Sequence, residues 1–232
     1  MIAVIVVPCY NEEAILEQTI KKLEDALSHT QHHVIIADNN STDRTSEIAH
    51  AHQSELISYN FVRQKGKGAV IKETWLKYTY DAYAFMDADL ATDLQALPQL
   101  LQGVEEGYDL VLGSRYIPGA HAERSFKREQ ISRVYRTLFH LAFTGEITDP
   151  QCGFKAISRR VRDTVVPLVT NDEFFFDSEL ILRVLRESYT FKEIPVTWKE
   201  QERSTVKMFR DVPKFLYGLC ELKYADMRGK ER

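Results

Sequence analysis

The chain of 232 residues is 44% apolar and 28% charged, a globular composition that excludes intrinsic disorder and low-complexity structure. Its 30 Lys and Arg residues against 34 Asp and Glu residues leave a formal charge of −4, which excludes a generally basic nucleic-acid-binding surface. The three cysteines stand far apart without a Cys/His cluster, so neither a zinc site nor a disulfide framework is expected. No apolar run has the length of a signal peptide or a membrane span, so we expect a cytosolic protein or one peripheral to a membrane.

Apolar runs alternate with amphipathic segments through the first half of the chain. Apolar runs predict strands at 2–7, 33–37, 56–59, 83–86 and 109–112. Apolar spacing and capping residues predict helices at 13–27, from a cap at 41–43 to about 51, at 68–78 and at 94–103. This alternation predicts an α/β, Rossmann-like fold with a mostly parallel central sheet and helices on both faces.

The second half of the chain has a different pattern of expected elements. It contains an expected basic and aromatic helix, a polar loop, a helix, a strand and a final amphipathic helix, at 124–143, 148–155, 174–187, 191–196 and 211–228. Because no linker or internal repeat interrupts the chain, we expect a single domain. Its nucleotide-binding half is expected at 1–113 and its acceptor half at 114–232.

Two carboxylates, Asp87 and Asp89, follow the expected strand at 83–86. In parallel α/β sheets ligands bind beyond the carboxyl ends of strands, and paired carboxylates there can hold Mg²⁺ or Mn²⁺ against a diphosphate. A solvated turn that caps a helix is the alternative, because this spacing is common by itself.

Two further polar segments follow expected strands or open a helix. Asp38 ends the second strand, where an acidic side chain can accept hydrogen bonds from a ribose or a base. The basic loop at 63–68 opens a helix, and its glycines allow a close backbone approach such as a phosphate needs. Taken alone, this loop is better explained by ordinary glycine turn chemistry, and it is neither a P-loop nor a GxGxxG fingerprint.

Seven motifs in a fixed order carry a resemblance that covers nearly the whole chain. They are VVPCYNEE at 6–13, DNNSTD at 38–43, KGKG at 65–68, DADL at 87–90, GSRY at 113–116, TDPQCGFK at 148–155 and FDSEL at 176–180. Together they resemble the family 2 inverting glycosyltransferases with a GT-A fold, in particular the polyprenyl- and dolichyl-phosphate glucose or mannose synthases.

The resemblance implies a role for each matching residue. Those implied to bind the nucleotide sugar are Pro8, Tyr10, Asn11, Glu12, Asp38, Lys67, Asp87, Ala88, Asp89, Arg203, Ser204 and Lys207. Asp87 and Asp89 are implied to hold Mg²⁺ or Mn²⁺, with Asp89 the closer ligand. Asp149, Asp89 and Gln151 are implied at the reaction centre. The residues expected to face the acceptor are Ser114, Arg115, Arg133 and Lys155.

The implied reaction moves a hexose from a nucleotide sugar to a lipid phosphate with inversion. The segments at 87–93 and 148–155 resemble the glucose synthases more closely and favour UDP-glucose over GDP-mannose, whereas Ala91 departs from the mannose-synthase pattern. Because a phosphate acceptor is already ionised, Asp149 is expected to orient the acceptor or stabilise positive charge; pairing with Lys155 or Arg115 is the alternative.

Three other functions remain open at this point. A family 2 enzyme with a saccharide hydroxyl as acceptor would need a true base, and a nucleotide-sugar-binding protein without activity would not need the Asp87/Asp89 pair. A dehydrogenase is poorly supported without GxGxxG. The basic helix at 124–143 and the final helix are expected either to pack on the core or to contact an anionic membrane.

Overall fold

The computed structural model of the chain describes residues 1–142, 147–173 and 175–201. The expected final helix at 211–228 therefore lies outside the described residues, as do Arg203, Ser204 and Lys207.

Strands and helices alternate through the first half, as the sequence predicted. The elements there are β1 (Ala3–Cys9), α1 (Leu16–Leu27), β2 (His33–Asp38), α2 (Thr45–Ala51), β3 (Ile57–Phe61), α3 (Lys67–Lys77), β4 (Ala82–Met86), the 3-10 turn η1 (Leu94–Ala96), α4 (Leu97–Glu105) and β5 (Leu110–Ser114). The α1 helix begins three residues later than the apolar spacing predicted.

The second half follows with β6 (His121–Glu123), α5 (Phe126–Ala142), β7 (Phe154–Ser158), α6 (Arg159–Thr164), the 3-10 turn η2 (Val166–Leu168), α7 (Phe176–Arg186), β8 (Phe191–Pro195) and β9 (Thr197–Lys199). The polar loop expected at 148–155 ends earlier than predicted, because β7 begins at Phe154. Arg124 precedes α5 rather than opening it. No helix in the described ranges is long and apolar enough to span a bilayer.

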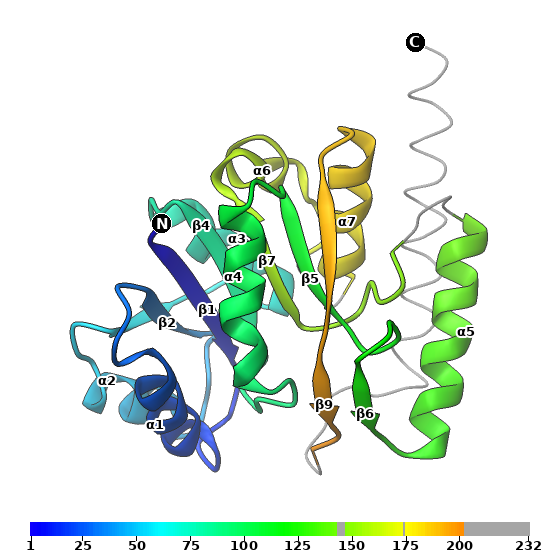
Figure 1. The fold of residues 1–232 in the computed structure, drawn as a ribbon. Helices are drawn as coiled ribbons and strands as arrows, with labels where there is room; N and C mark the ends of the chain where they lie inside the picture. The colour runs from blue at the N-terminus through cyan, green and yellow to red at the C-terminus, as the bar shows by residue number, and fades with distance from the viewer. Residues whose placement is uncertain (143–146, 174, 202–232) are drawn as a thin grey trace.

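One seven-stranded sheet organises the fold, in the order β3-β2-β1-β4-β7-β5-β8. Neighbouring strands run parallel except where β7 pairs antiparallel with both β4 and β5. The mostly parallel sheet was therefore predicted correctly, whereas the antiparallel insertion of β7 was not. A separate parallel pair, β6 with β9, lies beside the main sheet (Figure 1).

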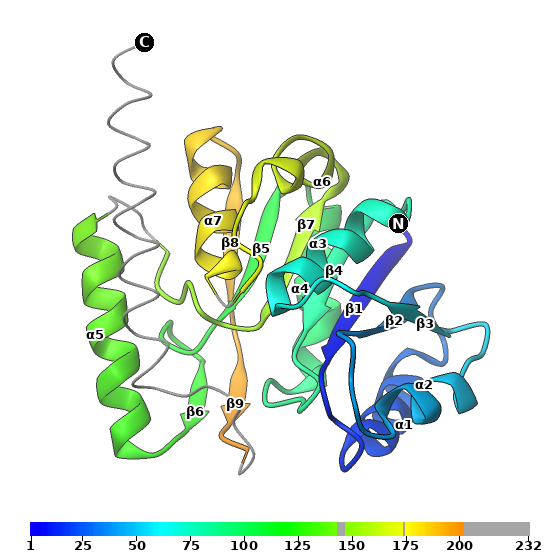
Figure 2. The same ribbon diagram turned by 180° about the vertical axis from the view of Figure 1, so that it is seen from behind.

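Helices cover both faces of the sheet, as expected (Figures 1 and 2). One face packs against α1, α2 and α4, and its core includes Ile5, Leu23 and Leu100. The other face packs against α3, α5, α6 and α7, and its core includes Trp75 and Phe176. Because β1 and β4 are buried on both faces, their sequences are continuous apolar runs rather than alternating ones.

The strand directions bring the polar segments of the chain to one end of the sheet, where the parallel strands terminate. Strands β1, β2, β4 and β5 all end there, and the antiparallel β7 begins there. Met86 at the end of β4 pairs with Phe154 at the start of β7. The segment before Phe154 therefore lies against the residues that follow Met86, although Met86 and Phe154 are 68 positions apart in the sequence.

Candidate active site

The loops after β1 and β2 are joined by hydrogen bonds between their side chains and backbones. Asn11 has a positive φ of 56°, and its side-chain oxygen accepts from the backbone N–H of Thr42 at 2.8 Å. The Thr45 hydroxyl accepts from the backbone N–H of Glu12 at 2.8 Å. The expected nucleotide-binding residues Tyr10, Asn11 and Glu12 therefore lie together in one braced loop. Tyr10 is 48% exposed there, whereas Pro8 lies within β1.

Asp38 is buried at the end of β2, with 1% of its surface exposed. Its carboxylate accepts from the backbone N–H of Ser41 at 3.0 Å and from the Tyr59 hydroxyl at 3.0 Å. Burial and the neighbouring Asp38 together raise the pKa of Tyr59, so the phenol stays neutral and remains a donor. The position agrees with a nucleotide-binding role, while Oδ1 also holds the loop at Ser41 and Oδ2 is bonded to Tyr59 on β3.

A chain of alternating charges runs from the surface into the core. Asp87 is 42% exposed, and its Oδ1 lies 2.8 Å from the Lys67 Nζ. Lys67 lies 3.6 Å from Asp177, which in turn contacts the fully buried Lys155 at 2.6 Å. Burial alone would lower the pKa of Lys67, but Asp87 and Asp177 outweigh it and raise it. Lys67 therefore remains charged beside Asp87, where it could also meet a diphosphate.

The segment at 87–90 has a tightly fixed geometry. Leu90 has a φ of 48°, which is uncommon for a residue with a branched side chain. The backbone N–H of Ala91 donates to Asp89 Oδ1 at 3.0 Å, and the carbonyl of Ala88 accepts from Thr19 on α1. The fold therefore holds both carboxylates at one tip of the sheet.

The chemistry of Asp87 and Asp89 is compatible with a divalent cation that takes its other ligands from a substrate and from water. A Cβ built on Gly153 would lie 2.0 Å from Asp87 Oδ2, so the carboxylate occupies space that only a glycine leaves open. Within the described residues no group of three or more His, Cys, Asp or Glu side chains could hold a metal ion. Mg²⁺ commonly uses one or two carboxylates and completes its shell with phosphates and water, which matches this arrangement.

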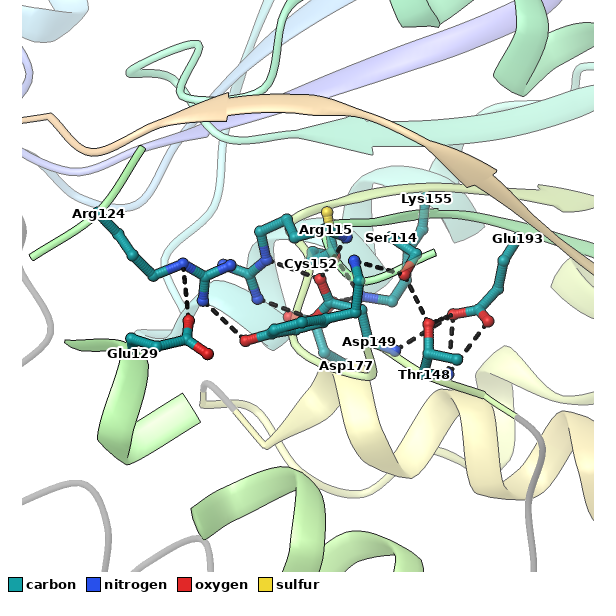
Figure 3. Close-up of polar contacts among 11 residues, drawn as sticks. Ser114, Arg115, Arg124, Glu129, Thr148, Asp149, Cys152, Lys155, Asp177 and Glu193 are labelled. Atoms are coloured by element: carbon teal, nitrogen blue, oxygen red, sulfur yellow. Dashed lines mark hydrogen bonds and ion pairs between the residues drawn. The ribbon is translucent and has the colours of Figure 1, made fainter. Parts of the chain in front are cut away.

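Across the same edge, Arg115 forms a buried ion pair with Asp149 (Figure 3). The Arg115 Nε and Nη2 atoms donate to the two carboxylate oxygens at 2.6 and 2.8 Å, and the backbone N–H donates at 3.0 Å. Burial alone would raise the pKa of Asp149, but Arg115 holds it below its ordinary value. The pairing with Arg115, which the sequence left open as an alternative, is therefore present.

Glu193 on β8 fixes the loop that carries Asp149. Its carboxylate accepts from the backbone N–H and the hydroxyl of Thr148, both at 3.0 Å, and from the backbone N–H of Asp149 at 3.2 Å (Figure 3). The Thr148 hydroxyl also bonds the Ser114 hydroxyl at 2.6 Å. Burial raises the pKa of Glu193, and repulsion by Asp149 adds to this. The sequence does not single out Glu193, because nothing near it marks its partners.

The expected acceptor residues do not all lie together. Ser114 and Lys155 are both fully buried and bonded to their own chain, so we now place them in support of the loop rather than against an acceptor. Arg133 is 63% exposed on α5 and lies 3.7 Å from Glu129. Gln151 is partly exposed in the loop that joins Asp149 to β7. Arg115 is the expected acceptor residue that the site holds in place by direct contact with Asp149.

The glycines of the 63–68 loop serve packing. A Cβ on Gly66 would lie 2.0 Å from the Asp172 carbonyl oxygen, and one on Gly68 would lie 2.5 Å from the Phe176 Cβ. The close approach at these glycines is therefore to the segment before α7. A phosphate contact at this loop stays a prediction. This packing places Asp177, the residue after Phe176, 3.6 Å from Lys67.

Cys152 and the two tryptophans differ in their surroundings. Cys152 is 1% exposed, and burial raises the pKa of its thiol to about 12, so it packs rather than reacts. Trp75 is fully buried in the core, while Trp198 faces Arg115, whose guanidinium carbon lies 5.3 Å from its ring centre.

Comparison with known proteins gives this site a family. The family model described as glycosyl transferase family 2 matches residues 4–166, which include the Asp87/Asp89 and Arg115/Asp149 pairs. The chain belongs to glycosyl transferase family 2. The resemblance drawn from the seven motifs is thereby confirmed.

Relatives of this family 2 chain carry names from lipid-linked sugar chemistry. It is 32% identical to the glycosyltransferase AglD of Haloferax volcanii over 90% of its own length and 35% of the relative. It is 27% identical to a polyprenol monophosphomannose synthase of Mycolicibacterium smegmatis, covering 88% of the chain and 80% of the relative. It is 25% identical to a dolichyl-phosphate beta-glucosyltransferase of Saccharomyces cerevisiae, covering 97% and 75%. The chain thus spans only about a third of AglD.

Solved structures confirm the GT-A fold. Glucosyl-3-phosphoglycerate synthase of Mycobacterium tuberculosis, crystallised with Mn²⁺, UDP and phosphoglyceric acid, superposes with a TM-score of 0.69 at 19% identity. The match covers 95% of this chain and 78% of that one. At this identity the likeness concerns the fold alone.

Proposed function

We propose that this family 2 chain transfers a hexose from a nucleotide sugar to a polyprenyl or dolichyl phosphate with inversion of configuration. The observation that carries the proposal is the meeting of two charged pairs at one sheet edge. Asp87 with Lys67 offers a place for a diphosphate, and Arg115 with Asp149 offers a cation on the acceptor side. The names of the relatives support a lipid phosphate as the acceptor.

In the proposed step, an oxygen of the lipid phosphate attacks the anomeric carbon while the bond to the nucleoside diphosphate breaks on the opposite face. We expect Asp87 and Asp89 to hold Mg²⁺ or Mn²⁺, which would neutralise the negative charge that develops on the leaving diphosphate. Lys67 adds a fixed positive charge beside Asp87. Tyr10, Asn11, Glu12 and Asp38 are proposed to hold the base and ribose.

The state of Asp149 favours a phosphate acceptor over a saccharide hydroxyl. A hydroxyl must lose a proton during attack, and a good general base has a pKa near the working pH. Asp149 has a lowered pKa and accepts three hydrogen bonds from Arg115, so it is a poor base. An ionised phosphate needs no such base, and we propose that Asp149 orients Arg115.

A donor and acceptor panel tests this proposal. We expect UDP-glucose with Mn²⁺ to raise the melting temperature more than GDP-mannose does, and the chain to glucosylate farnesyl phosphate but not a free saccharide. NMR of the product should show the anomeric configuration opposite to that of the donor. Transfer to the saccharide alone would disprove the lipid-phosphate acceptor. Equal stabilisation by UDP-glucose with and without Mn²⁺ would disprove the role of Asp87 and Asp89.

A further inference from the structure

Three arginines surround the ring of Tyr116, the residue after Arg115. The guanidinium carbons of Arg136, Arg124 and Arg115 lie 3.7, 4.9 and 5.9 Å from its ring centre. Arg124 also donates to the Tyr116 hydroxyl at 2.7 Å. These arginines come from three separate segments, namely α5, the residues before it and the end of β5, so the fold gathers them at one point.

The carboxylates of this region contact Arg115 and Arg124. Asp149 pairs with Arg115, and Glu129 lies 3.3 Å from Arg124 (Figure 3). Glu129 also lies 3.7 Å from Arg133, and Glu200 accepts from the backbone N–H of Ser125, next to Arg124. In the described part of the chain, no carboxylate pairs with Arg136. Its guanidinium stacks on Tyr116, yet its Nε is buried without an acceptor.

A buried N–H without an acceptor is rare and needs an explanation, especially on a charged group. Stacking on a tyrosine satisfies the face of a guanidinium but not the N–H groups at its edge. A planar guanidinium matches phosphate with two parallel hydrogen bonds, which a lysine cannot reproduce. A phosphate anion at the edge of the guanidinium would supply an acceptor of matching geometry.

We infer that Arg136 is a specificity-determining residue that, together with Arg124, binds the phosphate monoester of the acceptor. This inference rests on the proposed function, since it concerns the same acceptor. It places the acceptor phosphate beside Tyr116, between Arg115 and α5. The sequence predicted this contact for Arg133, three residues earlier, which is exposed in the structure.

Titration calorimetry with farnesyl phosphate tests the inference without requiring turnover. Arg136→Gln should weaken binding by about tenfold or more, the loss expected for a hydrogen bond to a charged group. The KM for farnesyl phosphate should rise by the same factor, while the KM for the donor stays unchanged. Arg136→Lys should restore only part of the affinity, because a lysine returns the positive charge but not the two parallel N–H donors of a guanidinium.

Arg160→Gln is the matched control, since Arg160 stacks on Tyr189 at 4.2 Å on another part of the surface. It should leave farnesyl phosphate binding unchanged. If Arg136→Gln binds farnesyl phosphate as wild type does, or if it lowers the melting temperature and raises the KM values for donor and acceptor alike, the inference is overturned. A wild-type chain that binds farnesyl phosphate but never glycosylates it would instead contradict the proposed function.

Discussion

At the scale of single residues, the Arg115–Asp149 pair joins two buried charges. Asp149→Asn should reduce the free energy of unfolding by about 3 kcal/mol, because it leaves a buried guanidinium without its anion. Urea unfolding at pH 7 measures this. Glu47→Gln, which breaks the exposed Arg44–Glu47 pair, is the control and should change nothing measurable.

The same pair makes a prediction about pH. Because the folded state lowers the pKa of Asp149, the ionised carboxylate contributes stability above its unfolded pKa of about 3.9, and this contribution is lost as pH falls towards the folded value. The stability gap between wild type and Asp149→Asn should therefore narrow below about pH 4. A gap that stays constant down to pH 3 would show that the charge of Asp149 is not what stabilises the fold.

Gly153 is a second residue with a testable role. In Gly153→Ala the new methyl group would displace the Asp87 carboxylate, whose Oδ2 lies 2.0 Å from the ideal Cβ position. We expect affinity for UDP-glucose to fall about tenfold in the presence of Mn²⁺ and to change little without it. Calorimetry under both conditions measures this difference. An equal loss under both conditions would mean that the methyl group acts on the loop rather than on Asp87.

At the scale of elements, β8 supports the loop that β7 begins. Glu193→Gln would place an amide N–H₂ against backbone N–H donors, so the segment at 148–149 should lose its fixed position. We expect the KM for farnesyl phosphate to rise about fivefold to tenfold with donor affinity retained. Glu106→Gln, which removes the partner of the adjacent Lys192, is the control in steady-state kinetics. Equal effects of the two variants would contradict a positioning role for Glu193.

The elements that could be predicted are those whose signals are local. Strands β1, β2 and β4 are uninterrupted apolar runs, and the spacing of Leu16, Ile20 and Leu23 marks α1. Strand β7 was missed because Lys155 interrupts its apolar pattern and the charge is satisfied by a residue on α7. The β6–β9 pair is only three residues long on each side, too short for any period.

Within the site, motifs predicted which residues gather but not how they are paired. The position of Asp87 and Asp89 followed from the end of a strand. The pairing of Arg115 with Asp149 joins residues 34 apart, and that of Lys67 with Asp177 joins residues even farther apart. Such contacts depend on the strand order, in particular on β7, which local periodicity does not encode.

At the scale of the whole molecule, α5 presents an apolar and basic outer surface. Phe126 is 77% exposed and Val134 is 55% exposed, and both lie within two turns of the exposed Arg133. Tyr135 and Phe139 face the core instead. This arrangement supports the proposal that the helix contacts an anionic membrane, where apolar side chains insert and arginines meet phosphate headgroups.

Vesicle sedimentation tests that proposal. Phe126→Ser combined with Val134→Ser should weaken binding to anionic vesicles severalfold and leave the melting temperature unchanged, because both side chains are exposed. Phe61→Ser, at an exposed position on the edge strand β3, is the control. If the double variant binds anionic vesicles as the wild type does, the outer face of α5 contacts solvent rather than a membrane.

The placement of β7 has a consequence for how the protein is made. A nascent chain that has just emerged past residue 113 already contains β4 and β5, but the strand that must lie between them has not been synthesised. Until it arrives, β4 presents an open edge to other chains, which is a recognised route to aggregation. A ribosome stalled at that length would thus hold an incomplete sheet, and neither half of the chain should survive as an independent fragment.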